Sequence, residues 1–138
     1  MKIKHVRVVG TGLIGTSIAL GLASRGVSID LHDEDPETLK LARDLLAPHL
    51  AEVSPDLVVI ATPPQSTLRA LEGEFDKNPQ SAFIDVASVK NNLLLQVERL
   101  TGLSQRFIGS HPMAGREVAG PPSAQGDLFQ GRAWILTP

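Results

Sequence analysis

The chain contains no cysteine in its 138 residues. Disulfides, a thiolate nucleophile and cysteine-ligated metals are therefore excluded, and the composition favours a reducing compartment. No stretch approaches the about 18 apolar residues of a membrane span, and the apolar run near the start is too short for a signal-peptide core. We expect a cytoplasmic protein with no membrane partner.

Basic runs and metal-binding motifs are also missing. The 13 basic and 15 acidic residues give a formal net charge of −2, and no basic stretch is interleaved with aromatic residues. Nucleic acid is therefore not an expected partner. No H-x-x-E-H pattern or carboxylate cluster suggests a metal site, so none is expected. The length fits a single domain that covers residues 1–138.

Apolar runs alternate with helical patterns along the chain. Strands are predicted at residues 5–10, 27–33, 56–64, 81–88, 106–110 and 133–137, and helices at 12–24, 36–47, 66–75 and 89–101. Asp35 followed by Pro36 is typical of a helix start. This alternation predicts an α/β fold with a doubly wound, mostly parallel Rossmann-type sheet and right-handed crossovers.

Polar, glycine-rich or proline-rich clusters follow five of the predicted strands. They are Gly10-Thr11-Gly12, Asp33, Thr62-Pro63-Pro64, Ser88-Val89-Lys90 and His111-Pro112. The carboxyl ends of parallel strands meet at one edge of a sheet, and doubly wound folds bind their ligands at that edge. We therefore expect the functional site to be built from these clusters.

The segment GTGLIG, residues 10–15, matches the pattern G-x-G-x-x-G between a predicted strand and a predicted helix. In this context Gly10 permits a tight turn, Gly12 lets the backbone approach a pyrophosphate, and Gly15 allows close packing of helix and strand. The start of the helix offers unpaired N–H groups and the positive end of its dipole to phosphates. The segment predicts a dinucleotide site.

Asp33 lies eighteen residues beyond Gly15, at the end of the second predicted strand. A carboxylate at this place accepts hydrogen bonds from a ribose diol. Asp33, Glu34 and Asp35 form an acidic run, and we expect no nearby arginine to receive a 2′-phosphate. We therefore expect NAD to be bound in preference to NADP.

Ser88 and His111 follow two strands that the predicted fold places side by side near the nicotinamide end of the site. A serine–histidine pair also occurs in hydrolases, but no G-x-S-x-G elbow is present, and Asp85 lies inside the predicted strand rather than at its tip. Dehydrogenation fits better, because a neutral imidazole can accept a hydroxyl proton while the hydride leaves for the nicotinamide. Lys90 could bind a carboxylate, cap a helix or face water.

Four segments together resemble the prephenate dehydrogenase family, which includes arogenate dehydrogenases. They are GTGLIGTSIA (10–19), ATPP (61–64), DVASVK (85–90) and the block from GSHPMAGRE to ILTP (109–138). The resemblance runs from end to end of the chain and implies NAD(P)-dependent oxidation of prephenate or arogenate. The ring hydroxyl is oxidised and carbon dioxide is lost, which is a step of tyrosine biosynthesis.

The resemblance also implies roles for individual residues. His111 is similar to the family histidine that takes the proton of the ring hydroxyl, and Ser88 to the serine that orients this histidine or the substrate. Glu117 resembles an acidic residue at the mouth of the substrate pocket. The expected contacts of the cofactor are Gly10, Gly12, Leu13, Ile14, Gly15, Asp33, Thr62, Pro63 and Ser88.

Two departures from the family pattern qualify these expectations. The chain ends at Pro138, where the family continues into a helical domain that forms the dimer, so we expect a homodimer only with that domain. The stretch before the predicted strand at 56–64 is short, which predicts an abbreviated third strand. Two other readings stay open: a β-hydroxyacid-type dehydrogenase, and a dinucleotide-binding module without catalysis.

Overall fold

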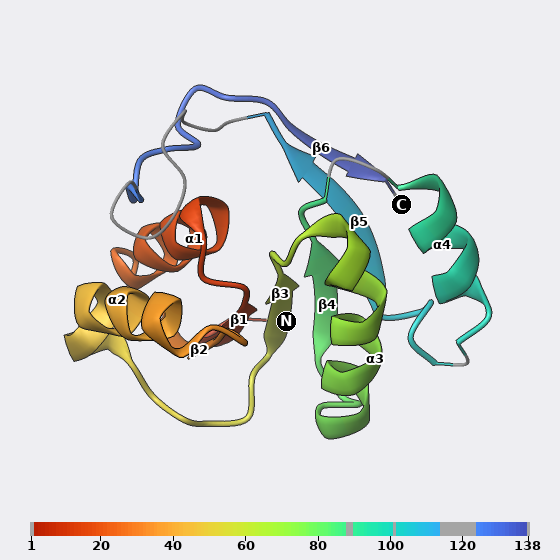
Figure 1. Ribbon diagram of the computed structural model, residues 1–138, viewed down its shortest axis with the longest axis horizontal. Helices are drawn as coiled ribbons and strands as arrows, with labels where there is room; N and C mark the ends of the chain where they lie inside the picture. The colour runs from red at the N-terminus through yellow and green to blue at the C-terminus, as the bar shows by residue number, and fades with distance from the viewer. Residues whose placement is uncertain (1, 88–89, 101, 114–123, 138) are drawn as a thin grey trace.

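A sheet of parallel strands with one antiparallel edge strand forms the centre of the molecule (Figure 1). The computed structural model describes residues 2–87, 90–100, 102–113 and 124–137. Within them the strands are β1 (His5–Val9), β2 (Ser28–His32), β3 (Leu57–Ile60), β4 (Ala82–Asp85), β5 (Phe107–Pro112) and β6 (Trp134–Thr137). Their order in the sheet is β2-β1-β3-β4-β5-β6, and only β6 runs antiparallel to its neighbour. The predicted doubly wound Rossmann-type fold is confirmed.

Helices cover both faces of this sheet (Figure 1). They are α1 (Leu13–Ala23), α2 (Pro36–Leu46), α3 (Thr67–Lys77) and α4 (Asn91–Glu98), with short 3₁₀ turns at Ala47–His49 and Pro64–Ser66. One apolar core joins α1 and α2 to the sheet, and a second joins α3 and α4 to the opposite face. As predicted, Asp35 caps α2, accepting a hydrogen bond from the Glu37 N–H, and Pro36 is its first residue.

The outer edge beside β2 carries only a trace of a further strand. Leu50 makes an isolated parallel bridge with Ile29, and the Ala51 N–H donates to the Ile29 carbonyl at 2.9 Å. This single bridge is the abbreviated third strand that the sequence predicts.

Three strand ends differ from the prediction by two residues or more. β3 ends at Ile60 rather than at 64, and β4 ends at Asp85 rather than at 88. β5 continues past 110 to include His111 and Pro112, which pair with Ile135 and Trp134 of β6. Pro112 is tolerated in this strand. The Met113 N–H donates to the Ala133 carbonyl, and neighbouring residues of a strand point their backbone nitrogens to opposite sides, so the Pro112 nitrogen faces away from β6. On the side that the Pro112 nitrogen faces, β4 has already ended, so the N–H that proline lacks would have no strand partner there.

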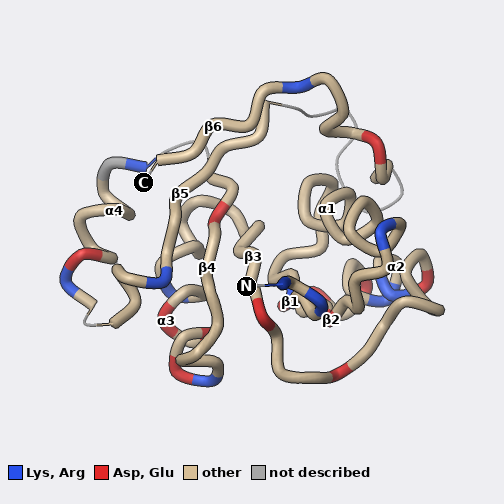
Figure 2. The backbone as a smooth tube through the Cα atoms, turned by 180° about the vertical axis from the view of Figure 1, so that it is seen from behind, with Lys and Arg blue, Asp and Glu red and all other residues tan. Residues whose placement is uncertain are grey.

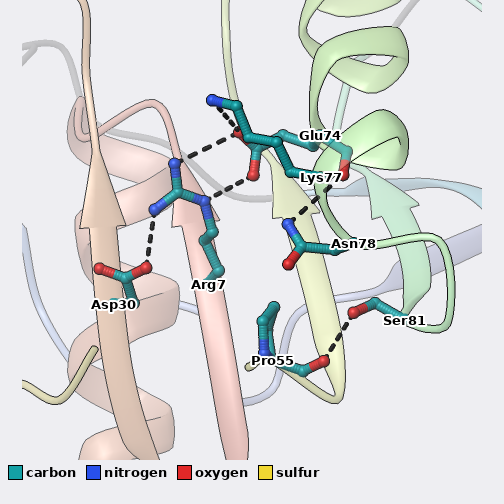
Figure 3. A network of polar contacts seen from close by, with 7 residues as sticks. All are labelled: Arg7, Asp30, Pro55, Glu74, Lys77, Asn78 and Ser81. Atoms are coloured by element: carbon teal, nitrogen blue, oxygen red, sulfur yellow. Dashed lines mark hydrogen bonds and ion pairs between the residues drawn. The ribbon is translucent and has the colours of Figure 1, made fainter. Parts of the chain in front are cut away.

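Charged side chains bridge the sheet and α3 on the face that α3 covers (Figure 3). Arg7 of β1 bonds Asp30 of β2 at 2.7 Å and Glu74 of α3 at 2.5 Å. Burial opposes the positive charge, but the hydrogen bonds to Glu74 and Asp30 outweigh it and raise the pKa of Arg7. The network fixes the position of α3 against the first two strands.

Elsewhere acidic and basic residues are interspersed along the described chain (Figure 2). Among the described residues, no helix has the length and apolar character that a membrane crossing needs.

Asp56 yields a pH-dependent prediction, because its carboxylate accepts the N–H groups of Lys4 at 2.8 Å and His5 at 3.0 Å. These hydrogen bonds lower the pKa of Asp56. A carboxyl group whose pKa is lower in the folded than in the unfolded protein stabilises the fold at pH values above its unfolded pKa. This stabilisation is lost as the pH falls through the pKa of the folded protein.

We therefore expect Asp56→Asn to lower the urea midpoint at pH 7, and the difference from the parent to vanish as the pH falls below about 4. Urea unfolding followed by circular dichroism over this pH range measures it. Asp44→Asn, at an exposed position of α2, is the matched control. A midpoint difference that stays constant with pH would contradict the prediction.

Candidate nucleotide site and catalytic edge

The glycine-rich turn between β1 and α1 is held by close backbone contacts. Gly10 has a φ of +98°, and a Cβ atom there would lie 2.5 Å from the Ala61 carbonyl oxygen. A Cβ atom on Gly15 would lie 1.9 Å from the Gly10 carbonyl oxygen. Both positions therefore require glycine, for the turn and the helix packing that the sequence predicts. A Cβ atom on Gly12 would meet nothing within 4 Å, so the backbone there faces open space.

The start of α1 leaves its first N–H groups without a side-chain cap. Gly12 is the N-cap residue and makes no side-chain hydrogen bond, and the first turn carries no acidic residue. The Leu13 side chain is buried and that of Ile14 packs against the core, so only their backbone N–H groups can serve a ligand. Such a helix start favours a phosphate group.

Asp33 ties the end of β2 to this turn. One carboxylate oxygen accepts the Thr11 N–H at 2.7 Å and the Thr11 hydroxyl at 3.0 Å, and the other accepts the Asp35 N–H at 2.9 Å. A carboxylate offers about four acceptor positions, so the second oxygen keeps capacity for one more donor. Asp33 therefore has a structural task that the sequence did not indicate, and it remains able to bind a hydroxyl.

A groove of about 490 Å³ runs along the carboxyl ends of β1, β2 and β3 and the adjacent face of α3. The structure brings four of the predicted cofactor residues together in its wall: Gly10, Asp33, Thr62 and Pro63. Sequence reasoning missed the α3 side of the groove, which includes Arg69, Gly73, Glu74 and Lys77. Arg69, Gly73 and Lys77 share one face of α3, because they are spaced four residues apart.

Arg69 corrects one expectation about the acidic run. Its guanidinium lies 3.5 Å from the Glu34 carboxylate, although the two residues are 35 positions apart in the sequence. An arginine is therefore near the acidic run in space. The Asp35 carboxylate of this run accepts hydrogen bonds from the Thr38 hydroxyl and the Glu37 N–H, which lower its pKa.

His111 occupies the other end of the same sheet edge. It is partly buried in β5, and its Nδ1 atom is buried without a hydrogen-bond partner among the described residues. The expectation that His111 follows the strand, outside the ladder, was wrong: pairing with Ile135 of β6 holds its backbone. Ser88 and Glu117, the other residues expected there, lie outside the described residues.

Asp85 was also misplaced by the sequence analysis, because β4 ends at this residue. Its carboxylate is fully buried and accepts hydrogen bonds from Lys90 Nζ, from the Ala87 N–H at 3.1 Å and from the Ser110 N–H at 3.2 Å. The Ser110 hydroxyl donates to the Asp85 carbonyl at 2.5 Å. Asp85 thus joins the turn after β4 to the residue that precedes His111, and it is the carboxylate that Lys90 binds.

Asp85 and Ser110 belong to neighbouring strands, as predicted from the topology, since β4 and β5 pair in parallel with Asp85 opposite Gly109. The glycine-rich turn, the acidic residue after β2 and the parallel strand order define a Rossmann-type nucleotide-binding domain.

Comparison with known proteins identifies the family. Residues 6–138 match the family model described as prephenate dehydrogenase, nucleotide-binding domain, and the chain belongs to this family. It is 37% identical over 134 residues to the probable prephenate dehydrogenase NovF of Streptomyces niveus, covering 95% of this chain and 37% of that protein. It is 32% identical over 146 residues to prephenate dehydrogenase of Bacillus subtilis, covering 96% of this chain and 39% of that protein.

Solved structures agree with this assignment. Prephenate dehydrogenase of Aquifex aeolicus, in complex with hydroxyphenyl propionate and NAD⁺, has a TM-score of 0.85 at 29% identity, covering 100% of this chain and 51% of that one. Synechocystis arogenate dehydrogenase has a TM-score of 0.81 at 30% identity, covering 97% and 50%. The chain therefore spans about half the length of these proteins or less.

The buried pair of Asp85 and Lys90 yields a stability prediction. Removal of one partner of a buried ion pair costs about 3–5 kcal/mol, because the other charge is left uncompensated. We expect Asp85→Asn to lower the free energy of unfolding by about 3 kcal/mol, measured by urea denaturation. The double variant Asp85→Asn with Lys90→Met recovers much of this loss, since no charge is then buried. A single variant within about 0.5 kcal/mol of the parent would show that the pair is not stabilising.

Proposed function

We propose that residues 1–138 are the nucleotide-binding, catalytic-histidine domain of an NAD-dependent dehydrogenase that oxidises prephenate or arogenate. The reaction removes carbon dioxide and gives 4-hydroxyphenylpyruvate or tyrosine. The observation that carries this proposal is that the nucleotide groove and His111 lie at the carboxyl edge of one parallel sheet. Membership of the prephenate dehydrogenase family supports it.

The described residues fit NAD. The open backbone at Gly12 and the uncapped N–H groups of Leu13 and Ile14 suit the pyrophosphate, and the free acceptor position on Asp33 suits a ribose hydroxyl. Thr62 and Pro63 supply the opposite wall of the groove. When bound, NAD⁺ supplies the hydride acceptor. NAD⁺ is also present in the Aquifex aeolicus prephenate dehydrogenase structure, which supports the same cofactor here.

His111 is the proposed base. A neutral imidazole accepts the proton of the ring hydroxyl as that hydroxyl becomes a carbonyl oxygen. The β5–β6 pairing fixes the backbone of His111, and the bonds of Asp85 to Ser110 fix the residue before it. A base held in this way needs little reorganisation in the reaction.

Ser88 and Glu117 complete the proposed site on the strength of the family resemblance. We propose that Ser88 orients His111 or the substrate beside the nicotinamide, and that Glu117 lies at the mouth of the substrate pocket. Substrate-binding groups beyond these residues, and the contacts of a homodimer, are proposed to come from the part of the relatives that this chain does not span. Such an enzyme acts in the cytoplasm on a small-molecule substrate.

Formation of NADH tests the proposal. We expect NADH to appear when NAD⁺ and prephenate, or NAD⁺ and arogenate, are added to a version of the protein as long as its relatives. The 138-residue chain alone is expected to bind NAD⁺ with little or no turnover. Binding without turnover in both versions would instead support a non-catalytic module. Turnover of a β-hydroxyacid in place of both cyclohexadienes would favour the other dehydrogenase class.

His111→Asn tests the base in the longer version. Loss of a general base lowers turnover by about 10²–10⁴-fold, while contacts at the glycine-rich turn are unchanged. We therefore expect kcat to fall by about this factor with the Kd for NAD⁺ within about twofold of the parent. His49→Asn, at an exposed position after α2, is the matched control. A near-parental kcat in His111→Asn would remove His111 from the mechanism.

A further inference from the structure

The rim of the nucleotide groove carries one ion pair that connects its two walls. Glu34 follows Asp33 at the end of β2, and Arg69 lies on α3 across the groove, with 3.5 Å between their charged groups. Both side chains are nearly four-fifths exposed, at 79% and 78%. A pair that exposed is weak, so it is expected to change the affinity of a competing ligand by a small factor rather than to exclude that ligand.

The surroundings of Arg69 leave its guanidinium room to move along the groove. The next residue on the same face of α3 is Gly73, where a Cβ atom would meet nothing within 4 Å. No packing contact therefore requires glycine at this position, and its effect is to widen the groove. Lys77, one turn further on, lies 4.0 Å from Glu74 at the far end, away from the acidic run.

The two nicotinamide dinucleotides differ at this rim. NADP carries a phosphate of charge about −2 on the adenosine ribose, where NAD carries a hydroxyl. Arginine binds phosphate strongly through paired N–H groups, whereas carboxylates repel it. Asp33, Glu34 and Asp35 supply the repulsion, and Arg69 is the cation that reaches this rim among the described residues that line the groove.

We propose that Glu34 is a specificity-determining residue: by holding Arg69 it keeps the guanidinium from a 2′-phosphate and so favours NAD over NADP. The inference rests on the proposed function, because it takes the groove to be the adenosine site. It adds a second determinant to Asp33, whose carboxylate is largely occupied by Thr11 and the Asp35 N–H.

Calorimetric titration of the 138-residue chain with NAD⁺ and with NADP⁺ tests the proposal without any need for turnover. In Glu34→Gln we expect the Kd for NADP⁺ to fall about fivefold, while the Kd for NAD⁺ stays within about twofold of the parent. Adding Arg69→Gln to this variant is expected to abolish the gain for NADP⁺, because the released guanidinium is what binds the phosphate.

Glu37→Gln is the matched control, since it removes one negative charge from the exposed first turn of α2 outside the groove lining. An equal gain for NADP⁺ in Glu37→Gln would overturn the proposal, because it would reflect net charge alone. Equal losses for both nucleotides in Arg69→Gln would also overturn it, since Arg69 would then contact a group they share. Absence of NAD⁺ binding to the parent chain would refute the proposed nucleotide site itself.

Discussion

The nucleotide site depends on the close approach of α1 to the turn that ends β1. Gly15 lies so near the Gly10 carbonyl that a single methyl group would overlap it, and Gly10 in turn lies against the Ala61 carbonyl of the segment after β3. This contact brings the start of α1 to the edge of the sheet with its first N–H groups uncapped. Asp33 then joins β2 to the same turn through both hydrogen-bond donors of Thr11. Any side chain at Gly10 or Gly15 would separate these parts, so the site could not form without the two glycines.

Carboxylates set the geometry at both ends of the functional edge, whereas the apolar cores supply most of the burial. At the nucleotide end Asp33 holds a loop through backbone N–H groups. At the β5 end the buried Asp85 does the same for Ser110, with Lys90 balancing its charge. A carboxylate can hold several N–H groups at once, which suits a strand end where backbone groups lose their ladder partners. The neighbour of each carboxylate network is a group with a proposed chemical task, and for Asp85 that group is His111.

The order of the elements, the glycine-rich turn and the parallel pairing of β4 with β5 could be predicted from periodicity and turn residues, which are local signals. The exact strand ends could not. β5 extends through His111 because β6 pairs with it, and that partner lies more than twenty residues further along the chain. The approach of Arg69 to Glu34 was missed for a similar reason, since it arises only when α3 and the end of β2 come to line the same groove. A signal did exist in the topology: the segment after β3 begins at the same sheet edge as the acidic run.

One sheet edge is proposed to hold the dinucleotide at its β1–β2 end and the base at its β5 end. An NMR titration of the ¹⁵N-labelled chain with NAD⁺ measures this most directly. The account predicts saturable shifts of the Gly12 and Asp33 backbone amides, together with shifts of the His111 ring nitrogens, all with one dissociation constant. Shifts confined to other surfaces would contradict the account, as would movement at Gly12 and Asp33 with no response at His111.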